Sequence, residues 1–381
     1  MRLPVFTPIP QFDTGPKSIS AVRVLRISVT DRCNFRCVYC MPEEGVRWLP
    51  KENLLTFEEI ADVVRAAIET HGIRRFKITG GEPTVRHGIV ELVRILRSIN
   101  GVEDLSLTTN GMLLPDLAHP LRQAGLDRVT VSMDSLRPER FRQITRTGDF
   151  ATVMHGIEAC EDEGLGSLKI NCVTMRGRND DELVDFAQMT IDRALTVRFI
   201  EYMPLGDAAL MHPDRGTGVS PVQSVDHGRD ARATIDASEL GPAGGCGAQD
   251  RGADSLIPEA EVRERIESAL GPLEPVDRAS EAGVGPAQVY RLRGAKGRIG
   301  FISAMSAPFC STCNRLRLTA EGVLRSCLFE GGEVDVRQVL RSIDDPRTRR
   351  IEVARAMAEC VRLKPDVHSH HGNQQMSRIG G

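Results

Sequence analysis

The sequence contains few aromatic residues and no long apolar run. Its 381 residues include one Trp, three Tyr and 12 Phe, so aromatic side chains make up only 4% of the chain. No stretch approaches the ~20 consecutive apolar residues that a membrane-spanning helix needs, and the N-terminal segment lacks the continuous apolar core of a signal peptide. We therefore expect no membrane association and a cytoplasmic location.

An excess of charge of either sign is also absent. The chain has 49 Lys and Arg against 52 Asp and Glu, which gives a formal net charge of −3. Proteins that read nucleic acids usually carry a basic surface and aromatic side chains on which bases stack. The sequence therefore disfavours a nucleic-acid reader, whereas a local basic pocket for a small anion is compatible with this balance.

The composition is that of a folded globular protein, with 41% hydrophobic and 27% charged residues. From about residue 24 to 203, short runs of β-type residues alternate with amphipathic helical segments. This alternation predicts parallel βαβ units, in either a barrel or an open α/β sheet. The six expected strands are 24–29, 75–79, 104–108, 128–132, 168–174 and 197–202.

Two local sequence patterns predict where a helix begins and where the candidate site lies. Thr56 and Glu59 form a capping-box pattern before an apolar stripe, which predicts that a helix begins there. Polar residues follow directly after the first four expected strands. Because ligands bind at the carboxyl ends of the strands in parallel α/β folds, the sequence predicts a single binding mouth.

The regular pattern stops at residues 216–256, a segment rich in Gly, Ala, Ser and Asp that we interpret as a solvated insertion. Helical periodicity resumes over 258–270, and a smaller region follows. The C-terminal tail contains His368, His370 and His371. We expect this tail to be solvated, because chain ends are ordered only where they are tied down.

Six of the ten cysteines form two tight groups, which is typical of metal binding in a reducing compartment. The groups are Cys33, Cys37 and Cys40, directly after the first expected strand, and Cys310, Cys313 and Cys327. Three thiolates can hold an iron–sulfur cluster and leave one iron without a protein ligand. Zinc is the alternative for both groups, although a structural zinc ion normally has four protein ligands.

The segment around the first cysteine group resembles the cluster motif of the radical S-adenosylmethionine (SAM) superfamily and reads RISVTDRCNFRCVYCMP over residues 26–42. Further segments make nearly the whole chain, apart from the insertion, similar to the GTP 3′,8-cyclase family of molybdenum cofactor biosynthesis. They are KITGGEPTVR (77–86), LTTNG (107–111), VSMDS (131–135), KINCV (169–173), RFIEYMPLGD (198–207), FCSTCNRLRL (309–318) and the terminal Gly380 and Gly381.

The resemblance implies a fold and a set of cofactors. The fold is α/β, with a partial (β/α)6 TIM-type barrel over residues 20–270, interrupted by the insertion at 216–256, and a smaller C-terminal iron–sulfur domain over 271–381. The cofactors are SAM and two [4Fe-4S] clusters, with the first cysteine group holding the SAM cluster and the second holding an auxiliary cluster. The implied SAM contacts are Tyr39, Gly81, Ser132 and Met203.

The implied reaction is a radical cyclisation of GTP and the first step of molybdenum cofactor biosynthesis. The 5′-deoxyadenosyl radical abstracts the ribose C3′ hydrogen, C3′ attacks guanine C8, and (8S)-3′,8-cyclo-7,8-dihydroguanosine 5′-triphosphate results. Gly380 and Gly381 assist the radical step, because only glycine enters so tight a space without steric cost. The implied GTP contacts are Arg26, Lys77, Thr108, Lys169, Arg315 and Arg317.

One segment departs from the family pattern. The family usually has Lys-x-Arg where this chain has Arg75-Phe76-Lys77, so the charge is kept while the guanidinium fork and the ammonium change places. Phosphate binding is expected to survive this exchange, although Arg and Lys are not equivalent in bidentate geometry.

The implied partners are GTP, a low-potential electron donor of the flavodoxin or ferredoxin type, and the cyclic pyranopterin monophosphate synthase that receives the product. The sequence leaves the oligomeric state open, with a homodimer as one option, and no nucleic acid is expected as a partner. Three alternatives stay open: another radical SAM enzyme with an auxiliary cluster, such as a peptide-modifying maturase; a non-catalytic zinc protein that binds nucleotides; and an enzyme disabled by its insertion. Iron and acid-labile sulfide analysis separates the zinc protein from the others.

Overall fold

The computed structural model describes residues 15–203, 205, 255–277, 285–329, 331–368 and 376–379. Helices and strands alternate through the first part of the chain, as the hydrophobic periodicity predicts. The strands are β1 (Val24–Ser28), β2 (Arg75–Thr79), β3 (Asp104–Thr109), β4 (Arg128–Ser132), β5 (Lys169–Thr174), β6 (Thr196–Glu201), β7 (Leu273–Pro275), β8 (Gln288–Leu292), β9 (Arg298–Ile302), β10 (Arg315–Leu318), β11 (Val323–Arg325) and β12 (Glu333–Asp335). The helices are α1 (Phe57–His71), α2 (Ile89–Arg97), α3 (Leu114–Gln123), α4 (Pro138–Thr145), α5 (Phe150–Asp162), α6 (Leu183–Asp192), α7 (Glu259–Leu270), α8 (Arg337–Ser342), α9 (Pro346–Arg362) and α10 (Met376–Ile379).

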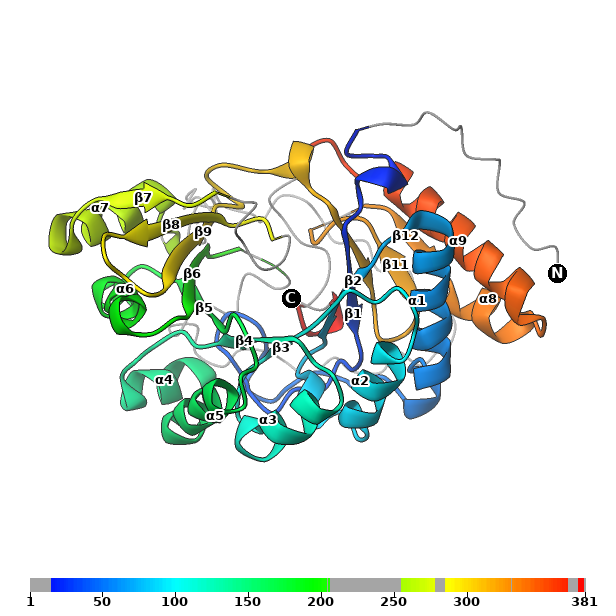
Figure 1. Ribbon diagram of the computed structural model, residues 1–381, viewed down its shortest axis with the longest axis horizontal. Coiled ribbons are helices and arrows are strands. Elements are labelled where there is room, and N and C mark those ends of the chain that lie inside the picture. The colour runs from blue at the N-terminus through cyan, green and yellow to red at the C-terminus, as the bar shows by residue number, and fades with distance from the viewer. Residues whose placement is uncertain are drawn as a thin grey trace, which may run out of the picture.

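The strands of the described residues form one twelve-stranded sheet in the order β12-β11-β10-β1-β2-β3-β4-β5-β6-β9-β8-β7. Strands β1 to β6 pair in parallel and in chain order, which confirms the six predicted runs to within one residue at each end. The sheet curves into an open ring, and helices α1 to α7 lie around its outer side (Figure 1). The fold is therefore a partial TIM-type barrel.

Strands from the C-terminal region extend both edges of this barrel. β10 pairs in parallel with β1, and β9 pairs in parallel with β6. The remaining C-terminal strands, β7, β8, β11 and β12, continue the sheet outwards in antiparallel pairs. The sheet is thus continuous across residue 270, where the sequence suggests that a separate smaller domain begins.

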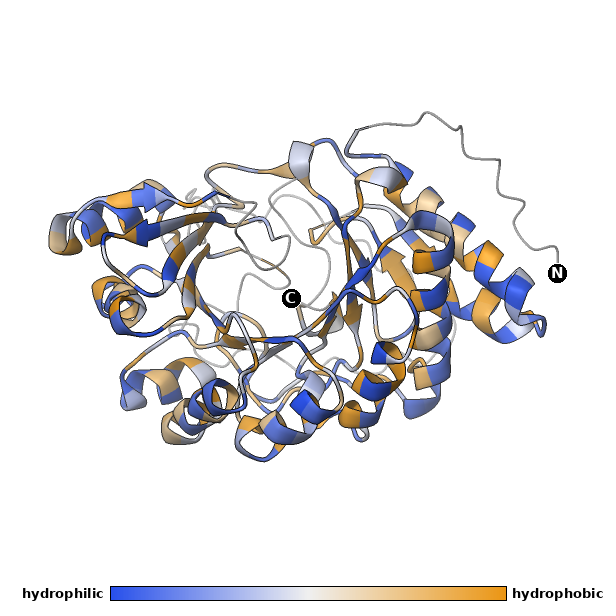
Figure 2. Cartoon of the chain, viewed as in Figure 1, coloured by the Kyte–Doolittle hydropathy of each residue, from blue (hydrophilic) through white to orange (hydrophobic). Residues whose placement is uncertain are grey.

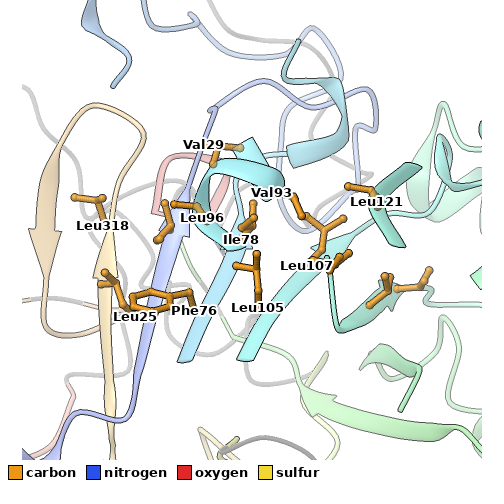
Figure 3. Close-up of a cluster of buried hydrophobic side chains, with 14 of the residues drawn as sticks. Leu25, Val29, Phe76, Ile78, Val93, Leu96, Leu105, Leu107, Leu121 and Leu318 are labelled. Carbon is orange, nitrogen blue, oxygen red and sulfur yellow. The ribbon is translucent and has the colours of Figure 1, made fainter. Parts of the chain in front are cut away.

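The alternation of side chains along each strand separates the core from the site. Leu25, Phe76, Ile78 and Leu107 are fully buried and pack with side chains of α2 and α3 on the outer side of the sheet (Figure 3). Figure 2 shows the matching pattern on the surrounding helices, which carry hydrophobic residues on one face and polar residues on the other. Because successive strand residues point to opposite faces, the residues between these core positions face the inside of the ring.

Helix α1 begins where the capping box predicts. Thr56 Oγ1 accepts a hydrogen bond from Glu59 N, and the Glu59 carboxylate accepts one from Thr56 N at 2.8 Å. The helix then packs against α9, and its last residue, His71, donates from Nε2 to Ala354 O at 2.8 Å. Within the described part of the chain, no helix is both long and apolar enough to cross a membrane.

Candidate active site

The first cysteine group lies in the loop that follows β1. Its three half-buried, free thiols line one cavity, here called the N-terminal cavity, together with Gly80, Gly81 and Glu82. The C-terminal end of α4 and the turn after it hold this loop through main-chain and side-chain hydrogen bonds. These bonds are Arg36 N to Thr145 O (2.9 Å), Val38 N to Ile144 O (2.9 Å), Thr147 Oγ1 to Asn34 O (2.7 Å), and Arg146 Nη1 to Arg36 O (3.2 Å) and Met41 O (3.1 Å).

Main-chain amides lie beside the thiols of this group. Phe35 N donates a hydrogen bond to Cys33 Sγ at 3.4 Å. The amides of Cys37 and of Ser377 in α10 act to lower the pKa of Cys37 and of Cys40, respectively. Burial nevertheless raises the pKa of Cys33 to about 11 and that of Cys40 to about 12. Three thiolates in this cavity therefore need compensating positive charge, which the iron ions of a cluster supply.

Close packing between two loops requires glycine at positions 80 and 81, a requirement that the sequence did not reveal. A Cβ on Gly80 would lie 2.6 Å from Thr30 O, and a Cβ on Gly81 would lie 2.5 Å from the carbonyl oxygens of Asp31 and Arg32. The two loops approach this closely because Gly81 N donates to Thr30 O at 2.7 Å. The glycines thus join the loops after β1 and β2, while Gly81 still lines the N-terminal cavity.

Glu82 is a buried residue of this cavity that the sequence analysis did not select. Its carboxylate accepts hydrogen bonds from Thr109 Oγ1 at 2.6 Å, from Asn110 N at 2.6 Å and from both donors of Thr84. Burial still raises its pKa. An acidic residue directly after two glycines at a strand end was the signal available in the sequence, and the structure shows that Glu82 ties the loops after β2 and β3 together.

A second and larger cavity, the central cavity, lies inside the ring of strands and has a volume of about 210 Å³. All six residues predicted to contact GTP line it, and so do three of the four predicted SAM contacts. Seven cationic side chains from six parallel strands line it: Arg26, Lys77, Arg128, Lys169, Arg198, Arg315 and Arg317. The register explains this convergence, because Arg26 of β1 lies opposite Lys77 of β2 and Arg317 of β10.

The cationic side chains of the central cavity repel one another, and burial together with this repulsion lowers the pKa of Arg26 and that of Lys77. Burial, followed by the charges of Arg317, Arg315 and Arg198, holds the pKa of Arg26 well below its usual range. Burial, then Arg198 and Arg26, does the same to Lys77. The carboxylates on the wall already have partners, since Asp104 pairs with Arg128 and Asp134 accepts from Tyr39 Oη at 2.7 Å and from Val173 N at 2.8 Å. A bound polyanion therefore relieves repulsion inside the cavity.

The second cysteine group lines a third cavity, the C-terminal cavity, together with Phe329 and His368. Cys313 differs from the thiols of the first group: burial opposes its ionisation, but Arg315 and Lys364 lower its pKa to about 7. Arg315 Nη2 lies 3.4 Å from Cys313 Sγ, and Lys364 Nζ donates to Cys313 O at 3.0 Å. Cations beside a thiol favour the thiolate that iron requires.

The three cavities adjoin one another. Tyr39, Thr108, Ser132 and Met376 line both the N-terminal and the central cavity. Met203, Ile302, Arg315, Arg317 and Leu328 line both the central and the C-terminal cavity. The cationic space therefore lies between the two cysteine groups. No three Cys, His, Asp or Glu side chains of the described residues gather closely enough to hold a single metal ion.

The C-terminal tail enters this site. His368 is buried, stacks on Phe329 with ring centroids 4.1 Å apart, and donates from Nε2 to Ala304 O at 2.8 Å, so the expectation that it is solvated is wrong. Helix α10 then lies inside the arc of strands (Figure 1), where Ser377 lines the N-terminal cavity. Gly380, Gly381, His370, His371 and residues 216–254 of the insertion lie outside the described residues.

Two family models match the chain. The model of the radical SAM superfamily matches residues 27–190, and the model described as Molybdenum Cofactor Synthesis C matches residues 233–370. Among solved structures, native anSMEcpe with bound AdoMet aligns with 47% of this chain and 52% of that chain, at a TM-score of 0.38 and 20% identity, which is too weak a likeness to carry an argument.

Curated relatives match almost end to end. The GTP 3′,8-cyclase of Pelotomaculum thermopropionicum is 45% identical over 364 residues, covering 94% of this chain and 98% of that protein. That of Moorella thermoacetica is 43% identical over 365 residues, with the same two coverages. That of Geobacter sulfurreducens is 40% identical over 366 residues, covering 94% of this chain and 97% of that protein.

Proposed function

The chain belongs to the GTP 3′,8-cyclase family of radical SAM enzymes, and from this membership we propose that it converts GTP to (8S)-3′,8-cyclo-7,8-dihydroguanosine 5′-triphosphate, the first step of molybdenum cofactor biosynthesis. The observation that carries the proposal is the central cavity, in which seven cations face one space between two groups of three cysteines. A nucleoside triphosphate matches this charge, and a peptide substrate does not require it.

Two iron–sulfur clusters and SAM are the cofactors of the proposed reaction. Cys33, Cys37 and Cys40 would hold the cluster that binds SAM, because the three thiols line one cavity and Cys33 Sγ accepts a hydrogen bond from Phe35 N at 3.4 Å. When bound, this cluster and SAM supply the 5′-deoxyadenosyl radical that abstracts the C3′ hydrogen of GTP. Cys310, Cys313 and Cys327 hold the auxiliary cluster, which the cations beside Cys313 support.

The residues of the cavities then have distinct roles. The proposed SAM contacts lie along the N-terminal and central cavities. Tyr39 and Ser132 line both cavities, Gly81 lines the N-terminal cavity and Met203 lines the central cavity. Arg26, Lys77 and Lys169 bind the triphosphate, and Thr108 adds a hydroxyl. Arg315 and Arg317 bind the nucleotide at the entrance to the C-terminal cavity. Gly380 and Gly381 assist the radical step.

The remaining parts of the proposal concern organisation and partners. We assign residues 20–270 to the SAM-binding barrel and 271–381 to the auxiliary-cluster region, whose strands extend both edges of the barrel sheet. A flavodoxin- or ferredoxin-type protein supplies the electron, and a cyclic pyranopterin monophosphate synthase receives the product. The enzyme acts in the cytoplasm.

An anaerobic turnover assay tests the proposed function. Protein reconstituted with iron and sulfide is mixed with reductant and SAM, with and without GTP, and the products are separated by chromatography. We expect 5′-deoxyadenosine and the cyclised guanosine triphosphate to appear together and only with GTP. If 5′-deoxyadenosine forms without a guanosine product, the substrate belongs to another class, such as a peptide. If neither product forms although the iron content is full, the protein is inactive.

A matched comparison tests the role of the cationic cavity in the same assay. Guanosine carries the same ribose and base as GTP but no phosphate, so it loses the charge-assisted hydrogen bonds to the cavity. We expect GTP to be cyclised and guanosine to be inert at the same concentration. Equal turnover of both compounds would show that the cations do not select the substrate.

A further inference from the structure

Ser377 occupies a position in the N-terminal cavity that the proposed function leaves unexplained. The residue belongs to α10, 337 positions after Cys40 in the chain, yet it lines the same cavity as the first cysteine group. It is only 2% exposed. A serine of the C-terminal tail therefore lies beside the cysteines of the loop after β1.

Two groups of Ser377 face this cavity in different ways. Its main-chain amide lies beside Cys40 and acts to lower the pKa of that thiol, which means that it favours the negatively charged sulfur. Its hydroxyl Oγ is buried and, among the described residues, has no hydrogen-bond partner. A buried hydroxyl without a partner costs free energy, so such a group in a cavity wall points to a ligand that satisfies it.

From these contacts, and resting on the function proposed above, we propose that Ser377 is a positioning residue of the SAM site: its amide sets the reduction potential of the cluster on Cys33, Cys37 and Cys40, and its hydroxyl binds SAM. An N–H donor stabilises the more negative, reduced cluster and so raises its potential. Under the proposed function SAM would bind in this cavity beside the cysteines, and its polar part would then be the partner of the hydroxyl.

The anchoring of the tail explains how Ser377 reaches this position. Lys364 donates to Cys313 O, and His368 is stacked on Phe329 in the wall of the C-terminal cavity. The chain is thus fixed at the second cysteine group before α10 enters the N-terminal cavity. Through Ser377, the position of the tail therefore affects the reduction potential of the first cluster. This role is separate from that assigned to Gly380 and Gly381.

The test uses the holoenzyme with both clusters and measures two quantities that do not require turnover. One is the dissociation constant for SAM, from equilibrium binding. The other is the midpoint potential of the cluster whose electron paramagnetic resonance spectrum changes when SAM is added. The variants are Ser377→Ala, which removes only the hydroxyl; Ser377→Pro, which removes the amide hydrogen; and deletion of residues 380–381, which leaves Ser377 in place.

We expect Ser377→Ala to raise the SAM dissociation constant about tenfold, as loss of one hydrogen bond to a charged group does, with the potential unchanged. Ser377→Pro shifts the potential to more negative values, and deletion of residues 380–381 changes neither quantity while stopping cyclisation. An unchanged SAM affinity in Ser377→Ala overturns the role of the hydroxyl. An unchanged potential in Ser377→Pro overturns that of the amide. Failure of the parent protein to cyclise GTP, with these shifts intact, overturns the proposed function instead.

Discussion

Lys77 and Arg75 are the residues at which this chain departs from its family pattern, and the structure separates them. Both lie on β2, two positions apart, but Lys77 lines the central cavity and Arg75 is not among the residues of its wall. Lys77 Nζ lies 3.4 Å from Thr130 Oγ1, and burial, followed by the charges of neighbouring cations, holds the pKa of Lys77 well below its usual range. Lys77 therefore places an ammonium in the cavity, where the family pattern expected from the sequence resemblance has a guanidinium.

This difference predicts unequal effects of two matched substitutions. Lys77→Ala removes a charge-assisted bond to the triphosphate and raises the KM for GTP about 10-fold to 100-fold. Arg75→Ala leaves the KM within about twofold, because Arg75 does not line the central cavity. Initial rates over a range of GTP concentrations, with cluster content matched, measure both. A larger effect of Arg75→Ala than of Lys77→Ala would contradict the assignment of Lys77.

Glu201 joins three elements at the end of β6. Its carboxylate accepts hydrogen bonds from Met305 N at 2.8 Å, from Ser306 N at 2.9 Å and from Glu259 N at the start of α7 at 3.1 Å. It is only 3% exposed. The segment that leads into the second cysteine group and the helix after the insertion are thereby held at one point of the barrel.

Replacing this carboxylate weakens the junction of β6, α7 and the loop before Cys310. Glu201→Gln leaves a single acceptor oxygen where two are used, so the melting temperature falls by about 2–4 °C and iron is lost from the second cluster first. Anaerobic calorimetry and iron analysis measure the two effects. The exposed Glu274 of β7 provides the control, since Glu274→Gln is expected to change neither. Equal behaviour of the two variants would contradict the role of Glu201.

The contact between α1 and α9 predicts a pH dependence of stability. Burial lowers the pKa of His71, so the folded protein keeps the imidazole neutral at pH values where the unfolded chain binds a proton. Stability is therefore full above the ordinary pKa of 6.5 and is lost as the pH falls below it. We expect His71→Gln to reduce the loss of stability between pH 7.5 and 5.5, measured from urea midpoints. An identical loss in the parent and the variant would show that His71 does not contribute.

The same elements show what could be predicted from the sequence. The six parallel strands and the capping box of α1 are local patterns, and the position of Ser132 at the end of β4 followed from them. Arg26 and Lys77 were expected at strand ends but lie at the middle of β1 and β2, from where they line the central cavity. The placement of β9 and β10 at opposite edges of the sheet depends on pairing between segments far apart in the chain, which no local pattern specifies. The burial of His368 and Ser377 escaped prediction for the same reason: their partners lie in distant loops.

At the scale of the whole molecule, the insertion is bounded by anchored residues. Leu205 N donates to Met203 O at 2.9 Å before it, and Ser255 O accepts from Arg176 N at 3.0 Å after it. Deleting residues 216–250 leaves both contacts, and a shorter loop costs little closure entropy, about 0.6 kcal/mol per doubling of length. We expect the deletion variant to retain its melting temperature, its iron content and its rate of GTP cyclisation. Loss of activity with fold and iron intact would identify the segment as functional.

The pairing of β10 with β1 and of β9 with β6 has a consequence for biosynthesis. As the ribosome synthesises the chain from its N-terminus, β1 to β6 are complete when residue 201 has been added, but β10 ends only at residue 318. For more than a hundred residues of translation, both edges of the nascent barrel expose unpaired backbone groups of parallel strands. Such edges recruit other chains, so chaperone capture during this interval, rather than the stability of the finished enzyme, sets the yield of folded protein.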